Sequence, residues 1–413
     1  MEDYSFVVLG GILFLTIAIV LYSVPKLIEL AQMKKLFDDY KDERKIHNGF
    51  IPNIGGAAII IAFLVSFSLH PASSQLAGFE YLVAASIIVM AIGLKDDLLV
   101  ISSHKKLLGE MIIATIMIFG AGVTINSFGG VFGVHELPYA VSVLASYAVI
   151  IVLINAMNLI DGIDGLAASV TAAASLLFGI WFFMAGHYSL FVCSLVVSVC
   201  YTAFLVYNWS PAKVFMGDTG SLFAGFMLSF LAIHFLETGV YGSTIASWQA
   251  AVPVVLVAVL VIPLYDTLRV FLIRLWKKTS PFEADDNHVH HHFIRHGFTH
   301  SQSTMILIAI NLFILGTTLF LAQYLTINWL LFTVVALALV LLPTVHVKRR
   351  VLSLVQSQSP DRLQRILSIT SRTNGHHSGN GQLSPKDYYD RRARHRNGEE
   401  KQMNGVTEEL MNR

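Results

Sequence analysis

The sequence predicts an all-α polytopic membrane protein with about eleven transmembrane helices, its N-terminus outside and its C-terminus in the cytoplasm. Of the 413 residues, 55% are hydrophobic and only 13% are charged, and the mean hydropathy is +0.64. A soluble domain has a charged fraction of about a quarter. Most of this apolar surface must therefore face lipid or the inside of a helical bundle.

Hydrophobic runs of membrane-crossing length recur along the chain. About 20 apolar residues are needed, because about 30 Å of hydrocarbon is crossed at about 1.5 Å per residue. The predicted spans lie near 5–24, 50–70, 79–95, 107–124, 138–157, 166–185, 187–207, 214–236, 245–273, 303–323 and 326–346. After the first of them, residues 25–46 begin with Pro25 and alternate apolar with charged side chains, which predicts an interfacial amphipathic helix.

Basic residues mark alternate connections between these spans. They are Lys34, Lys35, Arg44, Lys45, Lys95, Lys105, Lys106, Lys213, Arg274, Lys277, Lys278, Arg295, Lys348, Arg349 and Arg350. The connections near 71–78, 125–137, 186–188, 237–244 and 324–328 contain no Lys or Arg. By the positive-inside rule, the basic connections are cytoplasmic. The net charge of +1 hides this asymmetry and gives no indication of nucleic-acid binding.

The composition divides the chain into a transmembrane domain, residues 1–350, and a polar cytoplasmic tail, residues 351–413. The tail is rich in Ser, Asn, Gly, Arg and His and has few large apolar side chains. It cannot bury enough surface to offset its chain entropy, so disorder is predicted. The basic cluster Arg391–Arg396 fits a solvated tail better than a contact with anionic lipid headgroups.

Five aspartates stand at three predicted span ends. Asp96 and Asp97 end the third span in GLKDDLL, Asp161 and Asp164 follow the fifth in NAMNLIDGIDGL, and Asp218 precedes the eighth in PAKVFMGDTGS. Taken singly, each fits a helix end, a turn or an N-cap. Placing a charged carboxylate close to the hydrocarbon core costs free energy, however, so such residues are usually functional. The predicted topology also puts all five carboxylates in the same aqueous layer. Together they predict a common functional site.

The chemistry expected of such a site is binding of a divalent cation. Neighbouring carboxylates repel one another, and oxygen ligands suit a hard cation. Mg²⁺ usually takes one or two carboxylates together with substrate phosphate oxygens, so phosphate chemistry is predicted. Asn155 and Asn158 precede Asp161 at helical spacing and supply neutral donors and acceptors.

A histidine cluster lies in the ninth connection. The segment DDNHVHHHFIRHGF contains His288, His290, His291, His292 and Arg295. Histidine clusters often bind zinc or copper, but no cysteine is near and the other candidate ligands are hard oxygens. We expect the imidazoles and the guanidinium to bind phosphates through N–H donors, with His292 in a supporting role.

These segments resemble, in order, those of the polyprenyl-phosphate N-acetylhexosaminyl-1-phosphate transferase family, glycosyltransferase family 4. They are RKIHNGFIPNIGG (44–56), GLKDDLL (93–99) followed by Lys106, NAMNLIDGIDGL (155–166), YNWSPAKVFMGDTGS (207–221) and DDNHVHHHFIRHGFT (285–299). The chain is most similar to the bacterial branch that uses UDP-N-acetylglucosamine and undecaprenyl phosphate. The branch using UDP-N-acetylmuramoyl-pentapeptide typically has Thr-Pro-Thr-Met-Gly-Gly where this chain has residues 51–56. Many relatives carry an acid where this chain has Val100.

The resemblance implies transfer of N-acetylglucosamine 1-phosphate to the lipid phosphate with release of UMP, in cell-envelope glycan synthesis at the bacterial cytoplasmic membrane. It implies Mg²⁺, with Mn²⁺ as a second option, and an active site facing the cytoplasm. Catalytic roles fall to Asp96, Asp97, Asp161, Asp164, His290 and His291, substrate binding to Lys45, Lys106, Asn155, Asn158, Lys213, His288 and Arg295, and metal binding to Asp218 and Asp97. The implied partners are the two substrates and membrane lipid; a homodimer is left open.

Three alternatives remain at this point. The same chemistry could act on another UDP-N-acetylhexosamine or on UDP-N-acetylmuramoyl-pentapeptide. An ion-coupled transporter would place its acids near the bilayer midplane, often within inverted repeats, whereas here they stand at span ends and no repeat is visible. A catalytically inactive scaffold for glycan assembly would not need the acids and histidines.

Overall fold

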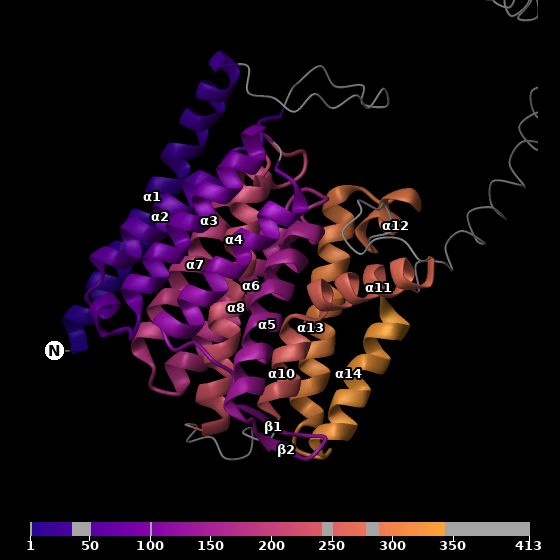
Figure 1. The fold of residues 1–413 in the computed structure, drawn as a ribbon. Coiled ribbons are helices and arrows are strands. Elements are labelled where there is room, and N and C mark those ends of the chain that lie inside the picture. Colours follow the sequence, from indigo (N-terminus) through magenta and orange to yellow (C-terminus); the bar gives the residue numbers. More distant parts are fainter. Residues whose placement is uncertain (1, 35–50, 100, 242–250, 278–288, 343–413) are drawn as a thin grey trace, which may run out of the picture. The chain divides into compact units, whose positions relative to one another are not determined.

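The computed structural model describes residues 2–34, 51–99, 101–241, 251–277 and 289–342. These residues form helices and one small hairpin (Figure 1). In chain order the elements are α1 (Glu2–Lys34), α2 (Gly55–Leu69), the 3-10 helix η1 (Pro71–Gln75), α3 (Phe79–Leu99), α4 (Ser103–Thr115), the π-helical turn η2 (Ile116–Gly120), β1 (Ser127–Val131), β2 (Val134–Glu136), α5 (Tyr139–Ile160), α6 (Leu166–Met184), α7 (Tyr188–Asn208), α8 (Gly217–Tyr241), α10 (Val252–Val259), α11 (Val261–Lys277), α12 (Val289–Arg295), α13 (His300–Leu321) and α14 (Ile327–Leu341).

The helical, multi-pass character predicted from composition is confirmed. Within the described ranges, six helices are long and apolar enough to cross a membrane, namely α1, α5, α6, α7, α8 and α13. A seventh span exists if α10 and α11, bent by 75° at their junction, are taken together. Helices α2 and α14 are apolar but have 15 residues each. The number of eleven spans and the orientation of the termini stay predictions. The predicted polar tail, residues 351–413, lies outside the described residues.

The first helix does not end where a proline suggests that it should. Helix α1 runs unbroken to Lys34 with Pro25 inside it, so a separate interfacial helix starting at Pro25 is wrong; residues 35–46 are not among those described. Proline has no N–H for the carbonyl four residues earlier, which is that of Leu21. The Tyr207 hydroxyl of α7 donates to this carbonyl at 2.9 Å and supplies the missing hydrogen bond.

Two departures from a plain bundle of straight helices are visible. The connection after α4 forms the antiparallel hairpin β1–β2, which the all-α prediction did not include. A glycine-rich sequence allows its tight turn, where Gly133 has a φ of +78°. The predicted span at 245–273 is broken between α10 and α11, and the Asn311 amide of α13 donates to the Ala258 carbonyl at 2.7 Å beside the break. A carbonyl released by the bend therefore keeps a donor.

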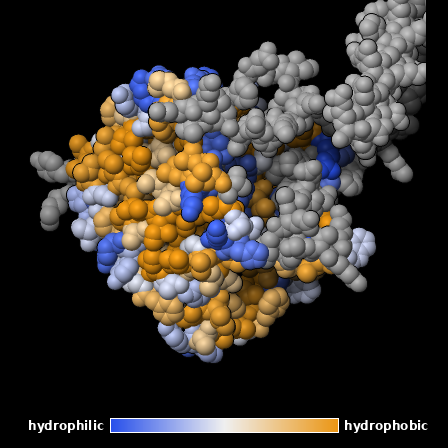
Figure 2. Space-filling model, turned by 45° about the horizontal axis from the view of Figure 1, so that its top comes forward, coloured by the Kyte–Doolittle hydropathy of each residue, from blue (hydrophilic) through white to orange (hydrophobic). Residues whose placement is uncertain are grey.

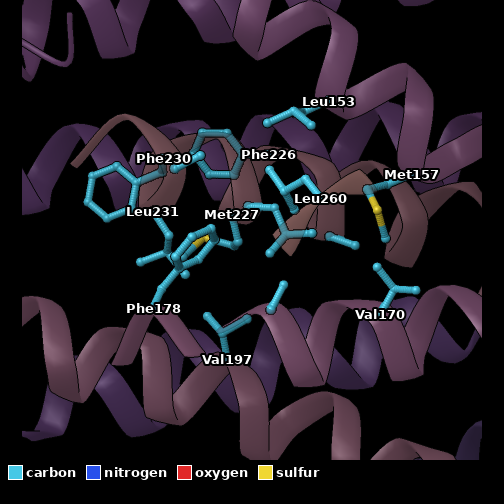
Figure 3. Packing of buried hydrophobic residues seen from close by; sticks show 14 of the residues in the cluster. Leu153, Met157, Val170, Phe178, Val197, Phe226, Met227, Phe230, Leu231 and Leu260 are labelled. Atoms are coloured by element: carbon cyan, nitrogen blue, oxygen red, sulfur yellow. The ribbon is translucent and has the colours of Figure 1, made fainter. Parts of the chain in front are cut away.

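Helix α8 is the centre of the apolar packing. Its Phe226, Met227 and Leu231 are buried to within 1% of full burial and pack among side chains of α5, α6 and α7, including Leu153 and Phe178 (Figure 3). The face of the molecule shown in Figure 2 is largely apolar as well, with polar residues gathered in smaller patches. Apolar side chains in the core and on the surface together are typical of a helix bundle in lipid. The core packing also holds α8 in place, and the first turn of α8 carries Asp218.

Candidate active site

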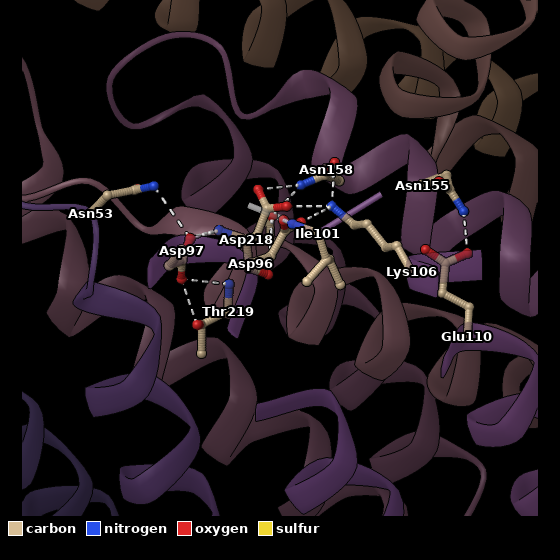
Figure 4. A network of polar contacts seen from close by, with 11 residues as sticks. Asn53, Asp96, Asp97, Ile101, Lys106, Glu110, Asn155, Asn158, Asp218 and Thr219 are labelled. Atoms are coloured by element: carbon tan, nitrogen blue, oxygen red, sulfur yellow. Dashed lines mark hydrogen bonds and ion pairs between the residues drawn. The ribbon is translucent and has the colours of Figure 1, made fainter. Parts of the chain in front are cut away.

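Polar side chains from four helices meet at the first turn of α8 (Figure 4). The Asn158 amide of α5 donates to Asp218 Oδ1 at 3.0 Å, and the Lys106 ammonium of α4 donates to Asp218 Oδ2. Lys106 also donates to Asn158 Oδ1 at 3.1 Å and lies 3.3 Å from Asp96 Oδ2 at the end of α3. The structure thus brings together Asp96, Lys106, Asn158 and Asp218, as the predicted topology requires.

The side chains of this cluster differ in exposure. Asp218 keeps 32% of its side chain exposed, whereas Lys106 keeps 13% and Asp96 11%. Lys106 therefore lies between two carboxylates and balances part of their charge, which a desolvated group requires. Asp218 is the member that a dissolved ligand can reach most readily.

Asp97 faces the opposite way from Asp96 and contacts the backbone of α8. Its Oδ1 accepts the Asp218 N–H at 2.7 Å and the Asn53 side-chain amide at 3.2 Å. Its Oδ2 accepts the Thr219 N–H at 3.0 Å and the Thr219 hydroxyl at 2.5 Å. Both oxygens are thus occupied by protein donors.

Asp161 follows the last residue of α5, and its backbone N–H donates to the Asn158 carbonyl at 3.4 Å. Its carboxylate has no hydrogen bond or ion pair within the part of the chain that the structure describes. Its pKa lies well above the usual carboxyl value, because of burial and then repulsion by Asp218, Asp97 and Asp164. A carboxyl group in this position lacks compensating positive charge. A cation bound beside it would remove the repulsion.

Asp164 belongs to a different set of contacts. Its Oδ1 lies 3.2 Å from His300 Nδ1, its Oδ2 accepts the Ala212 N–H at 3.2 Å, and its carbonyl accepts the Thr304 hydroxyl at 3.1 Å. Burial alone would raise the pKa of Asp164, but the hydrogen bond and charge of His300 hold it below its usual value. Asp164 therefore ties the loop after α5 to α13 and to the segment before α8.

Two residues beside the cluster were missed or placed differently by sequence reasoning. The Asn155 amide donates to Glu110 Oε2 at 2.5 Å and to the Ile151 carbonyl at 2.9 Å, so it faces Glu110 instead of Asp218. Glu110 is 2% exposed and lies one helical turn after Lys106. The sequence could have indicated Glu110, because it lies inside the predicted span 107–124 and an ionisable residue within a span is a functional candidate.

The remaining predicted residues lie on the segment before α8, on α12, or outside the described residues. Lys45 and His288 fall outside the described residues, and so do the side chains of His290 and His291 on α12. Lys213 is exposed, and its backbone N–H donates to the Tyr207 carbonyl at 2.8 Å. Arg295 ends α12 and is exposed. His292 Nε2 lies 2.9 Å from the Arg269 guanidinium.

The donor atoms of the site suit a hard cation. Among the described residues, no group of three His, Cys, Asp or Glu side chains lies close enough to hold a metal ion alone. Mg²⁺ does not need such a cage, because it keeps waters and takes one or two carboxylates with substrate phosphates. Asp218, partly exposed at the first turn of α8, and Asp161, whose carboxylate has no partner among the described residues, are carboxylates of this kind.

Comparison with known proteins identifies the family. The model of glycosyl transferase family 4 matches residues 79–236, which include Asp96, Lys106, Asn158 and Asp218. A Bacillus subtilis (strain 168) protein described as a probable undecaprenyl-phosphate N-acetylglucosaminyl 1-phosphate transferase is 30% identical over 277 residues, covering 65% of this chain and 73% of the relative. A Yersinia pestis undecaprenyl-phosphate alpha-N-acetylglucosaminyl 1-phosphate transferase is 30% identical over 65% of this chain and 72% of its own length.

A third relative differs in the lipid that its name gives. The Mycolicibacterium smegmatis decaprenyl-phosphate N-acetylglucosaminephosphotransferase is 31% identical over 318 residues, covering 71% of this chain and 77% of the relative. The shared part of all three relatives exceeds two thirds of their length. The matched segment contains the polar cluster at α8. The chain therefore belongs to glycosyl transferase family 4 and is a glycosyl-1-phosphate transferase.

Proposed function

We propose that the protein transfers N-acetylglucosamine 1-phosphate from UDP-N-acetylglucosamine to undecaprenyl phosphate and releases UMP, as the first membrane step of a cell-envelope glycan. The observation that carries the proposal is the meeting of Asp218, Lys106 and Asn158 at one end of the bundle. Relatives named for this sugar and lipid support it. The site would face the cytoplasm of a bacterial inner membrane, where a nucleotide sugar is dissolved.

The reaction exchanges one pyrophosphate linkage for another. An oxygen of the acceptor phosphate attacks the phosphorus that bears the sugar, and the bond from this phosphorus to the oxygen of the UMP group breaks. UMP leaves with that oxygen and its electron pair. The bond between the anomeric carbon and oxygen is untouched, so the sugar configuration is kept. Such a step depends on positioning and on neutralising phosphate charge.

The described residues supply both requirements. Asp218 would hold Mg²⁺, which would supply positive charge to neutralise the substrate phosphates. Asn158 holds the Asp218 carboxylate through its amide, and the Lys106 ammonium would bind phosphate oxygens of the substrates. Asp96, which lies 3.3 Å from the Lys106 ammonium, would orient the acceptor phosphate. Asp161 would contact the nucleotide or the water shell of the metal.

Residues on and before α12 complete the proposal. His288, His290, His291 and Arg295 would bind the phosphate being transferred, and Lys45 would attract the anionic substrates. The position of α12 at the same end of the bundle as the C-terminal end of α1 fits this (Figure 1).

Helix α11 supports a lipid acceptor. Among the α11 side chains that the structure describes, the exposed ones are apolar, whereas Asp266 and Arg274 are buried at 2% and 6% exposure. The exposed set is Leu268, Phe271, Leu272, Leu275 and Trp276. A helix with its apolar face outward faces lipid. Because α11 packs on α5, which leads to Asp161, a polyprenyl tail lying along α11 would keep its phosphate near the site.

The test is UMP formation by the purified protein in detergent. We expect release from UDP-N-acetylglucosamine and undecaprenyl phosphate that needs Mg²⁺ or Mn²⁺, and a loss of at least about a hundredfold in Asp218→Asn with the fold retained. UDP-N-acetylgalactosamine, UDP-N-acetylmuramoyl-pentapeptide and decaprenyl phosphate are the comparison substrates. Near-normal turnover in Asp218→Asn, or a preference for another sugar, would contradict the corresponding part of the proposal.

A further inference from the structure

The Asp97 carboxylate has no acceptor position left for a ligand. An ionised carboxylate offers about four lone-pair positions, and Asp97 receives four protein donors. These are the N–H groups of Asp218 and Thr219, the Thr219 hydroxyl and the Asn53 amide. Figure 4 shows Asp97 directed to this backbone, on the far side of Asp218 from Lys106. This geometry does not suit a metal ligand or a base.

The donors that Asp97 satisfies belong to the start of a helix. The first N–H groups of an α-helix have no partner within the helix, and α8 begins at Gly217. Asp218 and Thr219 are its second and third residues, and Asp97 caps both N–H groups from a position 121 residues before Asp218. Negative charge is also favourable at a helix N-terminus because of the helix dipole.

The backbone around this contact leaves room for the carboxylate. A Cβ at Gly217, which has a φ of +70°, would come within 2.7 Å of Asp97 Oδ1. A Cβ at Gly93, one turn before Asp97, would come within 2.3 Å of Thr219 Cα. Two glycines thus let α3 and the start of α8 approach closely. This is a second observation, independent of the hydrogen bonds, that the contact is built into the fold.

We propose that Asp97 is a positioning residue: it holds the first turn of α8 and so fixes the direction of the Asp218 carboxylate, instead of binding metal itself. The inference rests on the proposed function, because that function gives Asp218 its role. It departs from the sequence-based expectation of a metal-binding Asp97. Of the adjacent pair, Asp96 contacts Lys106, and Asp97 contacts the backbone of α8.

The test compares Asp97→Ala with Asp97→Asn. Asparagine is about as good an N-cap as aspartate, and it keeps one accepting oxygen, but it can be neither a base nor a charged metal ligand. We expect kcat to fall in both variants, with kcat of Asp97→Asn about fivefold or more above that of Asp97→Ala. The KM for each substrate should change little, and the acidic limb of the kcat/KM profile against pH should persist in Asp97→Asn, because a base has not been removed.

Hydrogen exchange supplies a readout that does not depend on turnover. In Asp97→Ala, and more weakly in Thr219→Val, amides of a peptide covering 214–222 should exchange faster than in the unchanged protein. Glu80→Gln is the matched control, because it removes one charge from the exposed first turn of the same helix α3. It should leave both exchange and turnover unchanged.

The outcomes separate the two proposals. Unchanged exchange at α8 with lost turnover in Asp97→Ala would overturn the positioning role, and so would equal turnover loss in Asp97→Asn and Asp97→Ala. If Asp97→Ala does not fold, Asp97→Asn with Thr219→Val gives the same comparison: faster exchange with reduced kcat supports the role, and normal exchange with reduced kcat refutes it. Faster exchange in a protein that forms no UMP from any tested substrate would instead refute the proposed function.

Discussion

The ionised carboxylate of Asp161 lowers the stability of the folded protein. Burial and the charges of Asp218, Asp97 and Asp164 raise its pKa, and no side chain in the described ranges compensates it. At neutral pH the folded state therefore either ionises it against repulsion or binds a proton that the unfolded chain would release. Residues of this kind persist where function uses the charge.

Asp161→Asn should stabilise the protein and inactivate it. A carboxyl with a raised folded-state pKa opposes folding above its unfolded pKa of about 3.9. The gain in Tm should thus be largest at neutral and alkaline pH, on the order of 2 °C, and vanish as pH falls below about 4. Thermal unfolding in detergent between pH 4 and 8 measures it. Added Mg²⁺ should raise Tm of the unchanged protein more than that of the variant, and an Asn variant with lower Tm at pH 8 would contradict the argument.

At the scale of elements, helix α1 shows how one side chain replaces a backbone donor. Pro25 leaves the Leu21 carbonyl without its intrahelical N–H, and the Tyr207 hydroxyl of α7 takes that place. The same pattern holds at the junction of α10 and α11, where Asn311 of α13 serves Ala258. Irregular backbone at membrane depth is tolerated where neighbouring helices supply such partners.

Tyr207→Phe should destabilise the protein by about 1–3 kcal/mol, since it leaves a carbonyl without a donor. The double variant with Pro25→Ala should recover most of this loss, because alanine restores the N–H that Leu21 lacks. The free energies of unfolding of the two single variants and the double variant give the coupling energy between Tyr207 and Pro25. Additive losses would mean that Tyr207 does not act through the carbonyl of Leu21.

At the scale of the whole molecule, the sequence predicted which polar residues come together better than it predicted the path of the helices. Positions such as Asp218 and Lys106 follow from where hydrophobic runs end, which hydropathy locates well. The break beside Val259 could not be predicted, because the apolar run continues through it and its partner Asn311 lies 53 residues from Ala258 in the chain. The direction in which Asp97 points was equally hidden, since it depends on the packing of α3 against α8.

Orientation in the membrane is testable on the whole protein. Cys193 and Cys200 are buried, so Lys213→Cys, at an exposed position before α8, introduces a single accessible thiol. A membrane-impermeant maleimide should label it in inverted inner-membrane vesicles and not in intact spheroplasts, as the positive-inside rule requires. Thr326→Cys, in the short turn before α14, should show the reverse. Labelling of Lys213→Cys in spheroplasts would place the site on the outer side.

The outward apolar face of α11 has a consequence for how a lipid substrate enters and how its product leaves. A lipid that reaches the bundle along this face arrives from the plane of the bilayer. The product, which carries the same hydrocarbon tail, can leave by the same route without that tail crossing water. Encounter with such a lipid is two-dimensional, so its rate follows the number of lipid molecules per unit of membrane area. Diluting the bilayer with inert lipid would slow the enzyme even when the amount of acceptor in the sample stays constant.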